Sequence, residues 1–193
     1  MQLLRAHEAT QVPWKNGLGV TTELAVWPRG SSFDRDDFRW RLSAAAVEAD
    51  GPFSRFDGCD RVLVVTAGAG LVLDHGGAAP AATIVRLQPH AFAGEWTTTA
   101  QLVDGAVVDF NLIHRRDVPA ELAVFAGDDR PFEKDLAHAH VFVHLLQGSV
   151  GLSLASATAQ LDAGDSAWMH GARGSQRLRL CPRDAEWLIV RIG

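Results

Sequence analysis

The chain has 193 residues, 47% of them apolar, which is enough for one large domain or two small halves with a substantial core. Its 18 Lys and Arg against 23 Asp and Glu give a net charge of −5, and proteins that grip phosphate backbones are usually basic, so we expect no nucleic-acid partner. Two cysteines are too few for a disulfide framework, and no signal-peptide h-region or membrane-length apolar run is visible, so we expect a cytoplasmic chain with no membrane partner.

In chain order, the first distinctive segment is PWKNGLGVTTE, residues 13–23, where a proline and two glycines predict a sharp turn. The turn displays Trp14, Lys15 and Asn16. Loops with such groups often bind ligands because a rigid scaffold aims them. The alternative is a solvated turn with Trp14 packed in the core.

The next segment, FRWRLS at residues 38–43, alternates as a strand does. Its period of two places Arg39, Arg41 and Ser43 on one face, opposite the apolar residues. Parity alone favours a solvent-facing polar side. The alternative is a strand that lines a wet cavity, where an inward Arg41 needs an ionic partner or a bound anion.

Two further segments carry polar groups. Residues 48–61 hold four acids and two arginines among turn formers, a pattern typical of local turns and ion pairs. Residues 108–116, VDFNLIHRR, predict a strand with Asp109 and Asn111 on one face. Polar strand faces usually meet solvent, so this pair alone is weak support for a site.

Short runs rich in Val and Leu, bounded by turn formers, predict a mostly β chain with little helix. A strand, a glycine turn and a return strand occur over residues 63–73 and again over 145–154, each followed downstream by a turn. This weak repeat suggests two halves, although any β-sandwich contains such hairpins. Turn formers over 116–132 predict a bridge, so we expect halves at 1–116 and 133–193, joined by 117–132 and packed closely.

Four of these segments, PWKNGLGVTTE, FRWRLSAA, DGPFSRFDGCDRVL and VDFNLIHRR, together resemble the hallmarks of the HutD/Ves family in order and spacing. The resemblance implies a bicupin-like double β-barrel or jelly roll in a single chain. It also implies a link to bacterial histidine utilisation, as a sensor or modulator that binds a carboxylate or formyl intermediate such as formylglutamate. Leu18 departs from a family turn that often reads Gly-Gly-Gly, and we expect it to narrow the approach of this loop to a ligand.

Carried over by motif, the resemblance implies a pocket for a small-molecule ligand. Charge from Lys15 and Arg41, with hydrogen bonds from Asn16 and Ser43, suits a small anion. The implied ligand-binding residues are Trp14, Lys15, Asn16, Thr21, Glu23, Arg41, Ser43, Asp50, Phe53, Arg61, Asp109 and Asn111.

The histidines test the alternative of a metal-dependent cupin enzyme. His138 and His140 form an H-x-H pair, with His144 on the same strand face. In the usual metal-binding cupin pattern, a glutamate and a later histidine follow the H-x-H pair. Here Val141 stands at the glutamate position and Ser175 at the position of the later histidine, so we expect no metal and no cofactor.

Whether the protein is an enzyme stays open, with a binding role favoured and no catalytic residue assigned. A hydrolase or isomerase that uses Glu23 or Asp109 for acid–base chemistry is the second candidate. The third is an interaction protein with a vestigial cavity. Cupin-like sheets often pair across subunits, so a homodimer is compatible with the sequence.

Overall fold

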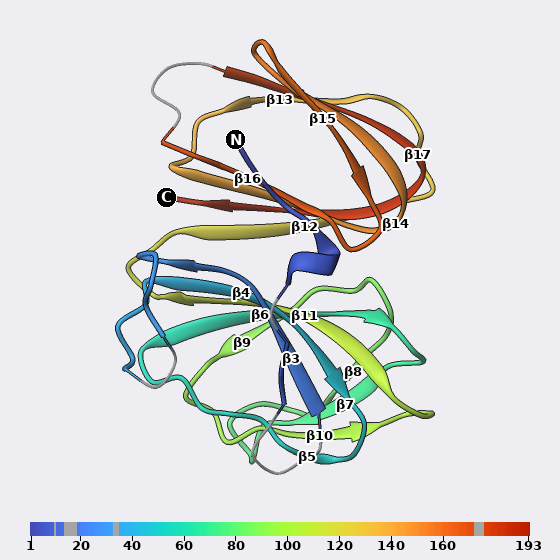
Figure 1. Ribbon diagram of the computed structural model, residues 1–193. Helices are drawn as coiled ribbons and strands as arrows, with labels where there is room; N and C mark the ends of the chain where they lie inside the picture. The colour runs from blue at the N-terminus through green and yellow to red at the C-terminus, as the bar shows by residue number, and fades with distance from the viewer. Residues whose placement is uncertain (10, 14–18, 33–34, 172–175) are drawn as a thin grey trace. The chain divides into compact units, whose positions relative to one another are not determined.

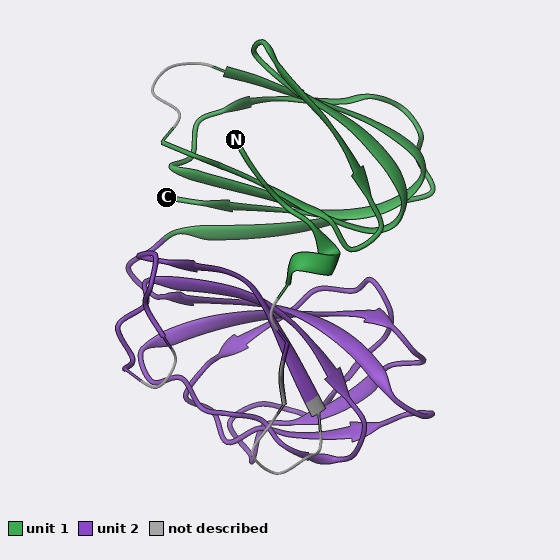
Figure 2. Ribbon diagram, in the orientation of Figure 1, with its two compact units in different colours: residues 1–9, 119–193 green, residues 10–118 purple. Residues whose placement is uncertain are grey.

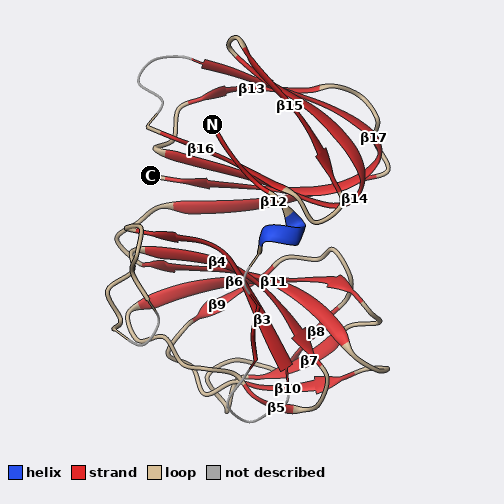
Figure 3. Ribbon diagram, viewed as in Figure 1, coloured by secondary structure: helices blue, strands red, loops and turns tan. Residues whose placement is uncertain are grey.

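The computed structural model describes residues 1–9, 11–13, 19–32, 35–171 and 176–193. Within these ranges nearly every element is a β-strand, and the one helix is the short 3-10 turn η1, Ala6–Glu8 (Figures 1 and 3). The predicted mostly β class is therefore confirmed. No helix in the described ranges has the length and apolar character that a membrane span requires.

The chain forms two compact units, which Figure 2 colours separately. Unit 2 consists of residues 10–118, and unit 1 of residues 1–9 together with 119–193. This division differs from the predicted halves in two places: residues 1–9 belong to the C-terminal unit, and so does most of the predicted bridge at 117–132.

Strand pairing explains the difference. Strand β1, Gln2–Leu4, pairs with β16, Ser166–His170, so the first residues join the C-terminal unit. The predicted bridge contains β12, Ala120–Ala126, which pairs along its length with β17, Gln176–Ile192. Turn formers at both ends of β12 hid a strand of ordinary length.

Unit 2 is built from two sheets. The six-stranded sheet has the order β2-β3-β4-β11-β6-β9, and the four-stranded sheet has the order β5-β10-β7-β8. The first comprises β2 Gln11–Pro13, β3 Gly19–Trp27, β4 Trp40–Val47, β11 Val107–Arg115, β6 Cys59–Ala67 and β9 His90–Ala93. The second comprises β5 Gly51–Pro52, β10 Thr99–Leu102, β7 Leu71–Asp74 and β8 Ala82–Ile84.

One apolar core in unit 2 draws side chains from both sheets, so the two sheets pack face to face. Leu63 and Val65 of β6 and Phe92 of β9 contribute from the larger sheet. The smaller sheet contributes Leu71, Leu73, Ile84 and Ala100.

Unit 1 contains a seven-stranded sheet with the path β1-β16-β14-β17-β12. Off this path, β13, Phe132–Leu136, pairs with β17, and β15, Ala157–Asp162, pairs with β14, His140–Leu154. Its core is apolar and includes Val141, Val143, Leu145, Leu178, Leu180, Trp187 and Ile189.

Both hairpins of the predicted repeat are wrong. In the first, β6 and β7 belong to different sheets, so the glycine segment between them crosses from one sheet to the other. In the second, β14 runs through Gly148 as one 15-residue strand. Its register with β17 shifts on either side of Gln147, so Gly148, at φ +76°, belongs to a bulge.

Candidate functional site

A row of polar side chains crosses the interior of unit 2. Glu23 on β3 lies opposite Ser43 on β4, and Ser43 lies opposite Asn111 on β11. The next residue in the row is Leu63 on β6. Directly opposite residues of antiparallel strands point to the same face. Because Leu63 belongs to the core between the two sheets, the whole row points inward.

The neighbouring row carries two arginines. Arg41 on β4 and Arg61 on β6 both lie opposite Ile113 of the strand between them, β11. Arg41 is two residues from Ser43 on β4, and Arg61 is two residues from Leu63 on β6. Both arginines therefore point to the same face of the sheet as that first row. The exposed fractions of Ser43, Arg61, Asn111 and Asp109 are only 3%, 5%, 5% and 1%.

The expectation that these polar faces meet solvent is thus wrong for Ser43, Asp109 and Asn111, whereas the Arg39 side chain is 47% exposed as expected. Trp40 and Leu42, on the opposite face of β4, are also buried. Alternation along a strand separates its two faces but does not reveal that both are covered.

A chain of hydrogen bonds holds Arg61. Its Nη2 donates to Oδ1 of Asn111 at 2.7 Å, and its Nη1 donates to the carbonyl oxygen of Ser54 at 3.2 Å. The amide Nδ2 of Asn111 donates in turn to Oδ1 of Asp109 at 2.6 Å. The hydrogen bond to Asp109 therefore sets the orientation of the Asn111 amide, and the hydrogen bond to Asn111 sets the position of the Arg61 guanidinium.

Aromatic rings surround the same guanidinium. Its central carbon lies 5.2, 5.3 and 4.9 Å from the ring centroids of Phe53, Phe56 and Phe92, within cation–π range. The buried Nε of Arg61 has no hydrogen-bond partner among the described residues. A desolvated cation with a spare donor is a favourable place for an anion.

Burial also sets the electrostatics of the site. It lowers the pKa of Arg61 to about 10, against the opposing influence of Asp109, so the guanidinium is still charged at neutral pH. Burial raises the pKa of Asp109 to about 7, although Arg61 and Asn111 both act to lower it. Near neutral pH the nearest buried carboxyl therefore neutralises Arg61 only in part.

Arg41 forms the more open side of the site. Its Nε donates to Oε2 of Glu23 at 2.9 Å, and its Nη1 lies 3.5 Å from Oγ of Ser43. The Arg41 side chain is 14% exposed and that of Glu23 is 39% exposed. Arg41 thus already has an internal carboxylate as its counter-ion.

The remaining predicted site residues are placed as follows. Thr21 lies opposite Ala45 on the inward face of the sheet and is partly buried. Asp50 is exposed, and its Oδ1 accepts a hydrogen bond from the backbone N–H of Leu102 at 2.7 Å, which ties it to β10 rather than to the Arg61 chain. Trp14, Lys15 and Asn16, like Leu18, lie outside the described residues.

Beside Phe92 lies a pair of histidines, His75 and His90, that belongs to none of the sequence motifs. Nε2 of His75 and Nε2 of His90 are 3.2 Å apart, and Nδ1 of His75 lies 3.0 Å from Oγ1 of Thr98. Burial lowers the pKa of both rings, which favours neutral imidazoles that share one hydrogen bond. His90 lies opposite Leu63 and therefore faces inward, a placement that follows from the register of a short strand and that no local sequence pattern indicates.

The H-x-H histidines belong to unit 1. His140 lies opposite His170 and His144 opposite Ser166, while His138 precedes β14. Among the residues that the structure describes, no three His, Cys, Asp or Glu side chains gather as a metal-binding group.

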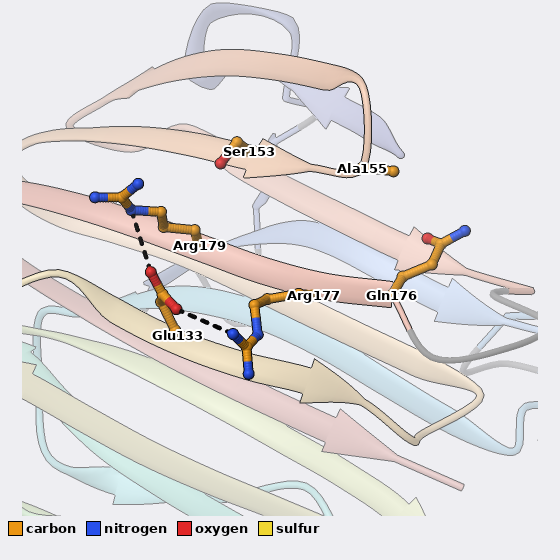
Figure 4. A pocket seen from close by; sticks show the side chains of 6 residues that line it. All are labelled: Glu133, Ser153, Ala155, Gln176, Arg177 and Arg179. Atoms are coloured by element: carbon orange, nitrogen blue, oxygen red, sulfur yellow. Dashed lines mark ion pairs between the residues drawn. The ribbon is translucent and has the colours of Figure 1, made fainter.

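A second group of arginines lies in an open groove of unit 1 (Figure 4). Glu133 of β13 pairs with Arg177 at 3.6 Å and with Arg179 at 3.4 Å. The two arginine side chains are 66% and 53% exposed, so water screens these pairs. The charged side chains of this groove are therefore exposed rather than buried.

Comparison with known proteins identifies the family. The HutD family model matches residues 6–188. A protein of the hutC 3′ region of Pseudomonas putida is 40% identical over 131 residues, which is 67% of each chain.

Two solved structures match almost the whole length of the chain. One is a conserved protein of unknown function from Pseudomonas aeruginosa PAO1, with a TM-score of 0.90 and 33% identity, covering 99% of this chain and 97% of that one. The other is HutD from Pseudomonas fluorescens SBW25, in a structure described as a formate condition. Its TM-score is 0.83 at 28% identity, and the match covers 100% of this chain and 98% of that one. The chain therefore belongs to the HutD family, which is associated with histidine utilisation.

Proposed function

We propose that unit 2 binds a small metabolite that carries a carboxylate or formyl group, such as formylglutamate, and that the protein senses or modulates histidine utilisation. We further propose that its two units are the two halves of a bicupin. Family membership supports the pathway, and the interior of unit 2 supports the ligand class.

The burial of Arg61 is the observation that carries the proposal. Burying an arginine that is only 5% exposed is costly unless charge and hydrogen bonds compensate it, and here the compensation is incomplete. Asp109 reaches Arg61 only through Asn111, and the Nε donor has no partner among the described residues. A ligand carboxylate would supply both the negative charge and the missing acceptor.

The surrounding residues favour a small organic anion over an inorganic one. Phe53, Phe56 and Phe92 give the site apolar walls, which suit a carbon chain. Arg41 and Ser43 offer further donors on the more open side, next to Glu23.

The test is calorimetric titration of N-formyl-L-glutamate into the wild-type protein, Arg61→Met and Arg55→Met. Arg55 is the matched control because it belongs to the same unit, is 58% exposed and pairs with Asp57 on the surface. We expect Arg61→Met to weaken binding by about 10- to 150-fold, the range for a hydrogen bond to a charged group. We expect Arg55→Met to bind as the wild type does. Equal affinity in all three proteins, or no binding to the wild type, contradicts the proposal.

One observation favours a second function. A carboxyl group whose pKa is near 7 is suited to general acid–base catalysis at neutral pH, and Asp109 is such a group. A hydrolase or isomerase would consume the bound metabolite. Incubation of N-formyl-L-glutamate with wild-type protein, followed by NMR of the mixture, separates the two functions. Turnover that is lost in Asp109→Asn supports the enzyme, whereas an unchanged ligand supports the binding protein.

A further inference from the structure

Asp109 and Arg61 are linked through a third residue. The guanidinium donates to Asn111 and the Asn111 amide donates to Asp109, at 2.7 and 2.6 Å. In the described contacts, the carboxyl therefore acts on the cation at a distance and orients the amide between them. A ligand that reaches Arg61 through its buried Nε would leave this chain in place.

The surroundings make the charge of Asp109 sensitive to such a ligand. Asp109 is 1% exposed and lies opposite Ala45 on β4 and Val65 on β6, which offer no side-chain hydrogen bond. Among the described residues, its ionised form is therefore favoured by the charge of Arg61 and the hydrogen bond from Asn111. A carboxylate bound to Arg61 would cancel the positive charge that favours ionisation and add a negative charge nearby.

Other charged and titratable groups share this interior. The opposing sheet presents apolar side chains from β7, β8 and β10 to the core. Burial lowers the pKa of His75 and His90 beside Phe92, which favours their neutral forms. Besides Arg61 and Asp109, the charged and titratable groups that face the site within the described residues are Arg41 from β4, Glu23 from β3, His75 after β7 and His90 from β9.

We propose that Asp109 is a proton-linked positioning residue of the Arg61 site, which binds one proton when a ligand carboxylate takes over the neutralisation of Arg61. The site therefore takes up a carboxylate and a proton together. This inference rests on the proposed ligand function. It adds that binding is coupled to pH and that Asp109 selects against ligands when it is ionised.

The expected pH dependence has a definite sign. Because the pKa of Asp109 is about 7, its carboxyl is mostly ionised at pH 8, and complete protonation there would take up close to one proton per ligand. Affinity then falls as pH rises, by close to tenfold per pH unit above pH 7. The carboxyl groups of N-formyl-L-glutamate titrate far below this range and do not contribute.

The experiment is calorimetric titration of N-formyl-L-glutamate at pH 8 in phosphate and in Tris, whose ionisation enthalpies differ greatly. We expect wild-type protein to show an apparent enthalpy that depends on the buffer and corresponds to uptake of most of a proton. Asp109→Asn should bind with no buffer dependence and with equal affinity from pH 7 to pH 9. Asp57→Asn, which removes a 79% exposed acid of the same unit, should behave as the wild type does.

Carbon-13 NMR of the Asp109 carboxyl in wild-type protein gives a second test that needs no variant. We expect the carboxyl signal to move toward the protonated position when the ligand saturates the site at pH 8. Binding without proton uptake, or a carboxyl that stays ionised in the complex, overturns the role of Asp109 and leaves the ligand proposal standing. No binding at any pH overturns both.

Discussion

Two groups of arginines in this chain show how burial changes what a charge can do. In unit 1, Arg177 and Arg179 lie in an open groove, paired with Glu133 and well solvated. In unit 2, Arg61 is desolvated, enclosed by aromatic rings and fixed by Asn111. Both places hold arginines beside carboxylates, and Arg177 also pairs with Asp135 at 3.3 Å, but of these arginines only Arg61 combines burial with a donor, Nε, that has no hydrogen-bond partner among the described residues.

The interiors of the two units differ in the kind of polar group that they bury. The core of unit 1 is apolar, with aliphatic residues at the inward positions of β14 and Trp187 on β17. Unit 2 has an apolar core beside a set of polar residues on the same sheet face. Unit 1 also buries polar side chains, including His144 and Ser166, whose Nδ1 and Oγ atoms lie 2.8 Å apart, so what sets unit 2 apart is an arginine, Arg61, that is only 5% exposed.

The largest expected effect comes from the core of unit 1. Trp187 is 2% exposed and stacks on Phe125 with a centroid distance of 4.1 Å. We expect Trp187→Ala to lower the free energy of unfolding by about 3–5 kcal/mol, measured by urea denaturation. Affinity for N-formyl-L-glutamate should be unchanged at a temperature where the variant is folded. A specific loss of binding would show that unit 1 contributes to the site.

The next effect concerns Asp109 and stability rather than binding. Its folded pKa, about 7, lies above the usual value of 3.8, so the stability that its neutral form contributes is present below pH 4 and is lost as pH rises to 7. Over that window the loss is at most about 4 kcal/mol. We expect Asp109→Asn to match the wild type near pH 4 and to become increasingly more stable toward pH 7. Urea denaturation at several pH values measures this difference. A constant difference would mean that Asp109 is not desolvated as described.

A smaller effect is expected at Glu23. Because its carboxylate occupies Nε of Arg41, it competes with an incoming anion. We expect Glu23→Gln to strengthen binding of N-formyl-L-glutamate by up to about fivefold, in keeping with an exposed ion pair worth up to about 1 kcal/mol. Calorimetry measures the change. Weaker binding would instead show that Glu23 contacts the ligand directly.

The smallest effect is expected in the groove of unit 1. We expect Arg179→Gln to change the free energy of unfolding by less than about 0.5 kcal/mol and to leave ligand affinity unchanged. Thermal unfolding with and without the ligand measures both quantities. A marked loss of affinity would move the candidate site from unit 2 to this groove.

The sequence predicted the class of the fold better than its connections. Runs of Val and Leu identified the strands of the core, and low helix content followed from the missing 3.6-residue period. The glycines at 68–70 and at 148 were interpreted as hairpin turns because a glycine suits a turn, a crossing between sheets and a bulge equally well. Pairing of β1 with β16 joins residues over 150 positions apart, which no local pattern reveals.

The candidate site was predictable only in part. The motifs supplied Arg61, Asn111, Asp109, Arg41 and Ser43, which the structure brings to one face. Parity could not show that this face is buried, because that depends on the second sheet of unit 2. The wall residues Phe56 and Phe92 and the pair His75 and His90 come from turns and short strands whose register the sequence does not specify.

The most direct test of the central claim is NMR observation of the arginine Nε–H groups while N-formyl-L-glutamate is titrated. The account predicts a saturable shift of the Arg61 signal, because its buried Nε gains an acceptor, with no change at Arg177 or Arg179. Binding that moves the Arg177 or Arg179 signal and leaves Arg61 unchanged would contradict the account.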